Sequence, residues 1–187
     1  MNVQTDLRMD KPTFLAWVQE REGRYELDDG HVVMMTAGSR GHERVIRRLA
    51  AALERRLDAN RWEVLTSNFA VELGPKTVRY PDVVVDSAQG SDKDLTATTP
   101  ILIAEVISPS SVADDLGDKA AQYLRSADLL AYLVLAQDEP KAWVWVRGNA
   151  GFPAGPEVIA GKDGVIRIPS LDIELQLAQI YAHISDA

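Results

Sequence analysis

Two carboxylates stand within runs of residues that are otherwise typical of buried strands. Asp82 directly precedes three valines, and Glu105 lies inside the apolar run 101–107. An ionised carboxylate is costly to bury unless a cation or a hydrogen-bond donor lies close by. Two carboxylates on neighbouring strands would provide the oxygen ligands that a hard divalent cation prefers. The pair therefore predicts a metal site and, with it, a metal-dependent hydrolase.

Each carboxylate also has a simpler interpretation. Asp82 follows a proline, which marks an edge, a bend or a bulge. It could therefore be a solvated residue at a strand end. Glu105 could form one half of a buried salt bridge, because glutamate is rarely buried without a partner.

A lysine and a histidine are placed where they could join these carboxylates. Leu116, Lys119 and Tyr123 are spaced by three and four residues, so they share one face of a predicted helix. Lys119 therefore borders the apolar side and can point toward the sheet; the alternative is an exposed lysine paired with Asp115. His42 precedes Ile46 by one turn, so it faces the same core, although a packed or surface histidine is equally compatible with this spacing.

Such a set of side chains would suit phosphodiester hydrolysis. The carboxylates would hold one Mg²⁺ or Mn²⁺ with several waters. The cation would lower the pKa of a bound water and offset the charge that grows on the phosphate. The ammonium group of Lys119 would position the water and stabilise the transition state.

Composition limits the possible classes of protein. The 187 residues fit a single domain, and 46% of them are hydrophobic, enough for a sizeable core. No apolar run approaches the roughly 18 residues of a membrane span. Cysteine is absent and there are three histidines. Disulfides, thiolate metal sites and His-rich zinc sites are thus disfavoured, and a reducing cytoplasm is expected.

Charge is unevenly distributed along the chain. The formal net charge is −8, which disfavours nucleic-acid binding in general. Residues 40–61 nevertheless hold seven arginines against three acidic residues, a local +4. This segment is either a solvated helix face with pairs such as Glu43 and Arg47, or a face that follows the phosphates of DNA.

The elements that must position these residues follow from hydrophobic periodicity. We expect helices at 13–21, 40–60, 114–126 and 175–184. Hairpins are expected at 24–36, around Asp29-Gly30, and at 158–168. Strands are expected at 63–66, 69–73, 76–86, 100–107, 129–135 and 142–147. This order predicts an α/β (α+β) domain over residues 1–187, with an N-terminal helix and hairpin leading into a mixed sheet flanked by helices.

The motifs resemble a known family. They are Tyr25-Glu26-Leu27 with Gly30, His42 on a helix, Pro81-Asp82-Val83, then Glu105-Val106-Ile107-Ser108-Pro109-Ser110 followed by Asp115, Lys119 and Tyr123, and finally Tyr132 at a strand. The pattern, over residues 10–180, is similar to the Uma-two family of "putative restriction endonucleases", within the PD-(D/E)XK nuclease superfamily. Tyr132-Leu133 departs mildly from the Tyr-Trp pair that is common in that family.

The resemblance implies an αβββαβ core and a magnesium- or manganese-dependent endonuclease that cuts DNA. It implies catalytic roles for Asp82, Glu105 and Lys119, and metal binding by the two carboxylates with the Val106 carbonyl. It also implies supporting roles for three further residues, Glu26, His42 and Tyr123. The wider superfamily has a lysine two residues after the glutamate. Ile107 occupies that position here, so Lys119 is expected to take over from the following helix.

Two other functions fit the same pattern. The acidic balance and the isoleucine at position 107 also suit a catalytically inactive nuclease-like fold that binds proteins or supports an assembly. Hydrolysis of another phosphoester is a third interpretation. A homodimer is a further expectation, because two sites cut both strands of a duplex more easily than one.

Overall fold

The computed structural model describes residues 3–107 and 116–182, and its centre is a six-stranded mixed sheet. Only β8 and β9 run parallel; the other neighbouring strands are antiparallel. In spatial order the strands are β11 (Glu157–Ala160), β10 (Lys141–Val146), β9 (Ala131–Ala136), β8 (Leu102–Ile107), β7 (Val83–Ser87) and β4 (Trp62–Thr66).

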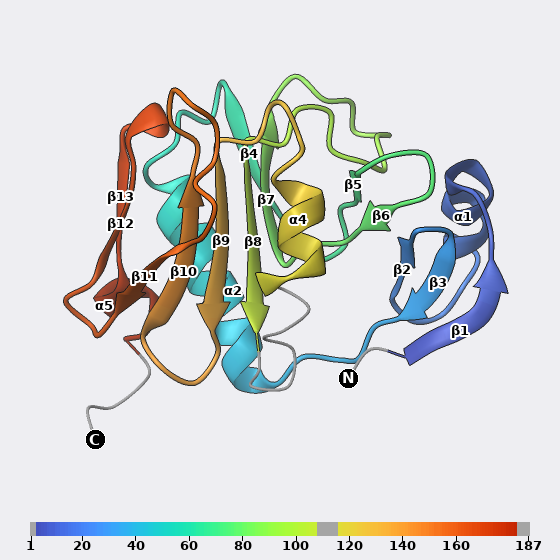
Figure 1. Ribbon diagram of the computed structural model, residues 1–187, viewed down its shortest axis with the longest axis horizontal. Coiled ribbons are helices and arrows are strands. Elements are labelled where there is room, and N and C mark those ends of the chain that lie inside the picture. Colours follow the sequence, from blue (N-terminus) through green and yellow to red (C-terminus); the bar gives the residue numbers. More distant parts are fainter. Residues whose placement is uncertain (1–2, 108–115, 183–187) are drawn as a thin grey trace.

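Helices cover both faces of this sheet (Figure 1). Helix α2 (Arg40–Glu54) packs its apolar side, including Leu49 and Leu53, on one face. The short helix α4 (Asp118–Tyr123) lies on the opposite face, where Tyr123 packs against Tyr132 and Ile107. Because side chains alternate along a strand, β8 contributes to both cores. The order α2, β4, β7, β8, α4, β9 confirms the predicted αβββαβ core.

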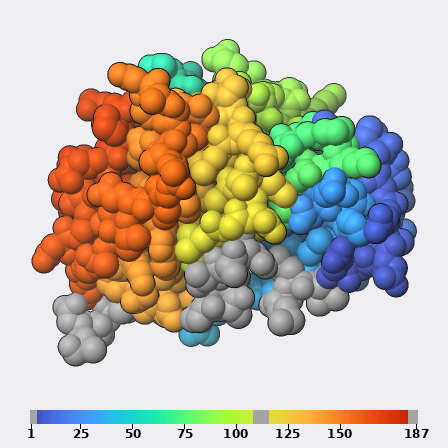
Figure 2. Space-filling model, in the orientation of Figure 1, coloured from blue at the N-terminus to red at the C-terminus, as the bar shows by residue number. Residues whose placement is uncertain are grey.

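A smaller sheet lies beside the large one. Its order is β1 (Val3–Arg8), β3 (His31–Met34), β2 (Tyr25–Asp28), β6 (Val78–Arg79) and β5 (Val71–Glu72). Helix α1 (Lys11–Val18) packs on it through Phe14, which shares a separate small core with Leu27 and Val32. Figure 2 shows helix α4, in yellow, at the surface between this N-terminal part and the C-terminal strands.

The remaining elements close the far end of the large sheet. The strands β12 (Val165–Ile168) and β13 (Ile173–Gln176) pair with each other and are joined by a short 3-10 helix (Pro169–Leu171). Helix α5 (Leu177–Ile180) follows them. Among the described residues, none of the helices combines the length and the apolarity that a membrane crossing requires.

The structure corrects several predicted elements. The expected strand 76–86 is two strands, because Pro81 has no amide to donate and a bend at Asp82 moves the chain from one sheet to the other. The hairpin expected at 158–168 is wrong: β11 pairs with β10, whereas β12 pairs with β13. Helix α2 ends at Glu54 instead of residue 60, and β13 occupies the start of the expected helix 175–184.

Candidate active site

Asp82 and Glu105 meet where the two sheets join. The antiparallel register of β7 and β8 pairs Val83 with Ala104, so one further step places Asp82 opposite Glu105. Both carboxylates are buried, with 5% and 4% of the residue exposed. The two carboxylates therefore lie on neighbouring segments, one directly before β7 and the other within β8.

Asp82 is oriented by a strand and a helix. Its Oδ2 accepts hydrogen bonds from the amide of Val106 at 2.8 Å and from Nε2 of His42 at 3.1 Å. His42 lies in the first turn of α2, and the Ser39 hydroxyl caps that helix by accepting a bond from the His42 amide at 3.1 Å. His42 thus contacts Asp82 and is largely buried, which leaves its supporting role a prediction.

The bond to Asp82 changes the protonation of His42. Burial alone would lower the pKa of the imidazole, but the hydrogen bond to Asp82 and the negative charge of that carboxylate outweigh burial. The pKa of His42 is therefore raised, which favours an imidazolium that donates to Asp82.

Glu105 is surrounded by groups from helix α4. Nζ of Lys119 lies 3.1 Å from Oε1 of Glu105, and the Tyr123 hydroxyl donates to the same oxygen at 3.0 Å. Lys119 is only 7% exposed, so it points to the sheet as its spacing predicts. Its alternative partner, Asp115, lies outside the described residues.

Ile107 lies two residues after Glu105 in the same strand, and it packs in the core beside Tyr123. The strand therefore offers no ammonium group at that position. Helix α4 supplies one instead, through Lys119. Burial, together with the charge of Glu105, raises the pKa of Tyr123 well above its ordinary value. The phenol consequently stays protonated and can donate to Glu105.

Glu26 forms a second centre beside the first. Its carboxylate is fully buried and accepts bonds from Nη1 of Arg79 and from the amide of Tyr80, both at 3.0 Å. Lys119 lies 3.9 Å from Oε1 of Glu26, so this lysine stands between the two glutamates. Glu26 is thus near the site as predicted, through Lys119.

Arg79 and Gln122 were not predicted from the sequence. Arg79 binds Asp28 at 2.6 Å in addition to Glu26, and its Nε donates to Gln122 at 3.0 Å. Gln122 in turn donates to Asp28 at 2.9 Å. The available signal was a charged residue, Arg79, directly before the Tyr-Pro-Asp segment, since such a residue needs a buried partner when its neighbours are apolar.

The donor set is compatible with an oxygen-preferring cation but is small. Within residues 3–107 and 116–182, no group of three or more His, Cys, Asp or Glu side chains has a geometry for holding a metal ion. Two carboxylates and the Val106 carbonyl would leave several positions for water, which is how Mg²⁺ is often bound. Among the described residues none donates a hydrogen bond to Oδ1 of Asp82, so that oxygen remains an available ligand.

Six of the seven arginines of residues 40–61 lie on α2 or just after it and divide into two groups; the seventh, Arg61, is exposed and lies over the ring of Trp62. Arg48 and Arg56 are partly buried and bind Gln179 beyond the C-terminal strands, which gives them a structural task. Four others on or just after α2 are exposed: Arg40, Arg44, Arg47 and Arg55. Any phosphate-binding face would therefore use the exposed group.

Comparison with known proteins agrees with this architecture. Residues 12–179 match the Uma2 family, described as "putative restriction endonuclease". The chain is 28% identical over 147 residues to the uncharacterized protein slr1290 of Synechocystis sp. (strain ATCC 27184 / PCC 6803 / Kazusa), covering 77% of each. It is 25% identical to the uncharacterized protein sll1609 of the same organism, over 73% of this chain and 80% of that protein.

A solved structure shares the fold. The crystal structure described as a "putative nuclease belonging to DUF820", from Anabaena variabilis ATCC 29413, superposes with a TM-score of 0.72. The match covers 90% of this chain and 97% of the other, at 12% sequence identity, which shows similarity of fold alone. The family match spans nearly the whole chain and includes every residue of the buried site, so this protein belongs to the Uma2 family.

Proposed function

We propose that the protein is a metal-dependent endonuclease that hydrolyses phosphodiester bonds in DNA. The observation that supports it most is the approach of Lys119 to Glu105 at 3.1 Å, next to the Asp82 carboxylate. This ammonium group comes from a helix, and so compensates for the isoleucine at position 107. The family description and the fold support the same reaction class.

Each side chain has a defined task in this proposal. Asp82, Glu105 and the Val106 carbonyl would hold Mg²⁺ or Mn²⁺, which when bound acidifies water and offsets phosphate charge. Lys119 orients the attacking water and stabilises the negative charge of the transition state. The attacking water gives a proton to solvent as its oxygen adds to phosphorus, one P–O ester bond breaks, and the departing alkoxide takes a proton from solvent. His42 and Tyr123 fix the two carboxylates.

The exposed arginines of α2 give DNA a path to this site. Arg47 lines a hollow that it shares with Ser67, and the Ser67 amide donates to the Asp82 carbonyl, so a strand bound at Arg47 would lie close to Asp82. Phosphate contacts of this kind are independent of sequence and weaken with salt. Binding is therefore expected to weaken between 50 and 200 mM salt, by about tenfold or more for three or four contacts.

Cleavage of plasmid and single-stranded DNA with Mg²⁺ or Mn²⁺ tests this function. Asp82→Ala and Glu105→Ala should each lower the rate by about 1,000-fold or more, because the cation contributes several kcal/mol to the transition state. Glu63→Ala is the matched control, since Glu63 is an exposed carboxylate on the edge strand β4. Undiminished cleavage by both alanine variants would overturn the proposal.

A second candidate, an inactive nuclease-like fold that binds proteins, also has support. Lys119 and Tyr123 already compensate Glu105, and His42 already contacts Asp82, so the centre is stable without a cation. Calorimetric titration separates the two functions without relying on activity. Heat of Mg²⁺ or Mn²⁺ binding that disappears in Asp82→Ala supports the nuclease; a flat titration of the native protein supports the binding module.

A further inference from the structure

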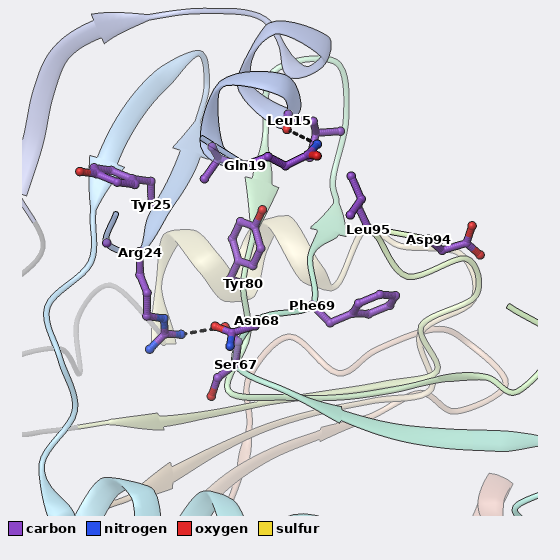
Figure 3. Close-up of a pocket in the computed structure, with 12 residues that line it drawn as sticks. Leu15, Gln19, Arg24, Tyr25, Ser67, Asn68, Phe69, Tyr80, Asp94 and Leu95 are labelled. Atoms are coloured by element: carbon purple, nitrogen blue, oxygen red, sulfur yellow. Dashed lines mark hydrogen bonds between the residues drawn. The ribbon is translucent and has the colours of Figure 1, made fainter. Parts of the chain in front are cut away.

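A cavity of about 280 Å³ is formed by residues other than the buried carboxylates (Figure 3). Its walls come from helix α1, the segment before β2, the turn that follows β4, and residues 94–95. This volume is near the lower end of the range for pockets that hold small organic ligands. The cavity is therefore large enough for a single ring system.

The walls combine flat rings with side-chain amides. Tyr25, Phe69 and Tyr80 contribute aromatic surface, and Gln19 and Asn68 contribute amide groups. In Figure 3 Tyr80 stands between Gln19 of α1 and Asn68 of the turn. Aromatic side chains stack on any nucleobase, and amides can both donate to and accept from its edge. Aliphatic surface from Leu15, Val18 and Leu95 completes the lining. Rings, apolar surface and amides together suit the flat face and the polar edge of a nucleobase.

Arg24 connects this cavity to the face of α2. Its Nη2 donates to the carbonyl of Ser67 at 3.0 Å, whereas its buried Nε has no hydrogen-bond partner among the described residues. Arg24, Ser67 and Asn68 also line a second hollow, of about 590 Å³, which extends along α2 past Arg47. Glu43 and Glu54 also line this second hollow. The two hollows share Arg24, and a guanidinium suits a phosphate oxygen.

The cavity is also linked to the carboxylates through the backbone. Tyr80 lies two residues before Asp82, and its amide donates to Glu26 at 3.0 Å. On the opposite wall, the amide of Ser67 donates to the carbonyl of Asp82 at 3.1 Å. Both walls are therefore tied to Asp82. The Tyr80 wall is two residues away along the chain, and the Ser67 wall is joined to it by one hydrogen bond.

We propose that the cavity receives an unstacked nucleobase of the DNA strand whose phosphate lies at Asp82 and Glu105. The proposal rests on the proposed function and adds a preference for one kind of DNA substrate. Removing a base from a duplex is unfavourable, and least so where the base is mismatched or single-stranded. The enzyme would thus favour single-stranded, mismatched or frayed sites over intact duplex.

The test compares binding of two strands in EDTA, where no cleavage occurs. One is a thymidine oligonucleotide, and the other is an abasic strand of equal length with the same sugar-phosphate backbone. The native protein should bind the base-bearing strand roughly tenfold more tightly, because stacking of one base contributes about 1–3 kcal/mol. Asn68→Ala and Tyr80→Leu should reduce this ratio, and Asn68 is exposed enough for its variant to fold.

The outcomes separate the cavity from the nuclease function. A ratio near one in the native protein, or an unchanged ratio in both variants, overturns the proposal while leaving cleavage intact. A general loss of affinity for both strands without a change in their ratio would also overturn it. Thymidine monophosphate that competes as strongly as the oligonucleotide would assign the cavity to free nucleotides instead, against the proposal.

Discussion

Two buried glutamates lie on either side of Lys119, and their neighbours differ. Glu26 is held by the guanidinium of Arg79 and a backbone amide, and Arg79 is itself bound by Asp28 and Gln122. Glu105 is held by an ammonium group and a phenol, and it faces the second carboxylate, Asp82. A buried acid alone therefore does not mark a site. In the proposed site, the distinguishing feature is a second carboxylate, Asp82, whose Oδ1 accepts no hydrogen bond from the described residues.

The largest expected effect comes from breaking the Glu26 centre. Arg79→Met leaves Glu26 buried with much of its compensation removed, and such losses lower the free energy of unfolding by about 3–5 kcal/mol. Urea denaturation measures this change. The double variant Glu26→Gln/Arg79→Met removes the stranded charge and should regain part of the stability. A single variant as stable as the native protein would show that Glu26 depends on Lys119 instead.

Lys119→Met tests the other half of the comparison, the surroundings of Glu105. We expect the cleavage rate to fall by about 100-fold, the usual cost of one lost transition-state donor. Its thermal stability should rise on addition of Mn²⁺, because a cation can then compensate Glu105 and binding stabilises the folded state. Arg79→Met is the comparison, because Mn²⁺ at Asp82 and Glu105 cannot take the place of the Arg79 guanidinium at Glu26 and should raise its stability less. Equal effects of Mn²⁺ on both variants would remove the distinction between the two centres.

A smaller effect is expected at the start of α2, because this end of the helix holds His42 against Asp82. Ser39→Ala removes the cap at the His42 amide and the bond from the Ser39 hydroxyl to Gln137. The loss should be about 1 kcal/mol of unfolding free energy. Asparagine caps a helix as well as serine does, so Ser39→Asn serves as the control. If the alanine variant kept native stability, the cap would have no part in holding His42.

The smallest effect concerns the rim of the Arg79 network. Burial would raise the pKa of Asp28, but the charge of Arg79 and the bond from Gln122 outweigh burial and lower it. Asp28 therefore stabilises the fold above its ordinary pKa of about 3.9 and loses that contribution as the pH falls below it. The stability difference between the native protein and Asp28→Asn should shrink in acid. A difference that stays constant from pH 7 to pH 3 would contradict this.

Local sequence patterns predicted the parts of the site that depend on one element. Glu105 in an apolar run indicated a buried strand, and the spacing of Lys119 and Tyr123 indicated a helix face turned to the sheet. Arg79 could not be paired with Glu26 in this way, because 53 residues separate them and the contact forms only after the small sheet assembles. Strand pairing at long separation likewise decided that residues 158–168 form no hairpin.

The link of Tyr80, Pro81 and Asp82 joins β6 of one sheet to β7 of the other. Three residues are just enough to connect the two sheets, so the length of this link is strongly constrained. A single inserted residue there would shift Asp82 away from Glu105 or rotate it to the other face of the sheet. The loop of residues 88–101 between β7 and β8 has no such constraint at its exposed tip. Insertions and deletions among relatives should therefore accumulate in that loop and avoid the link.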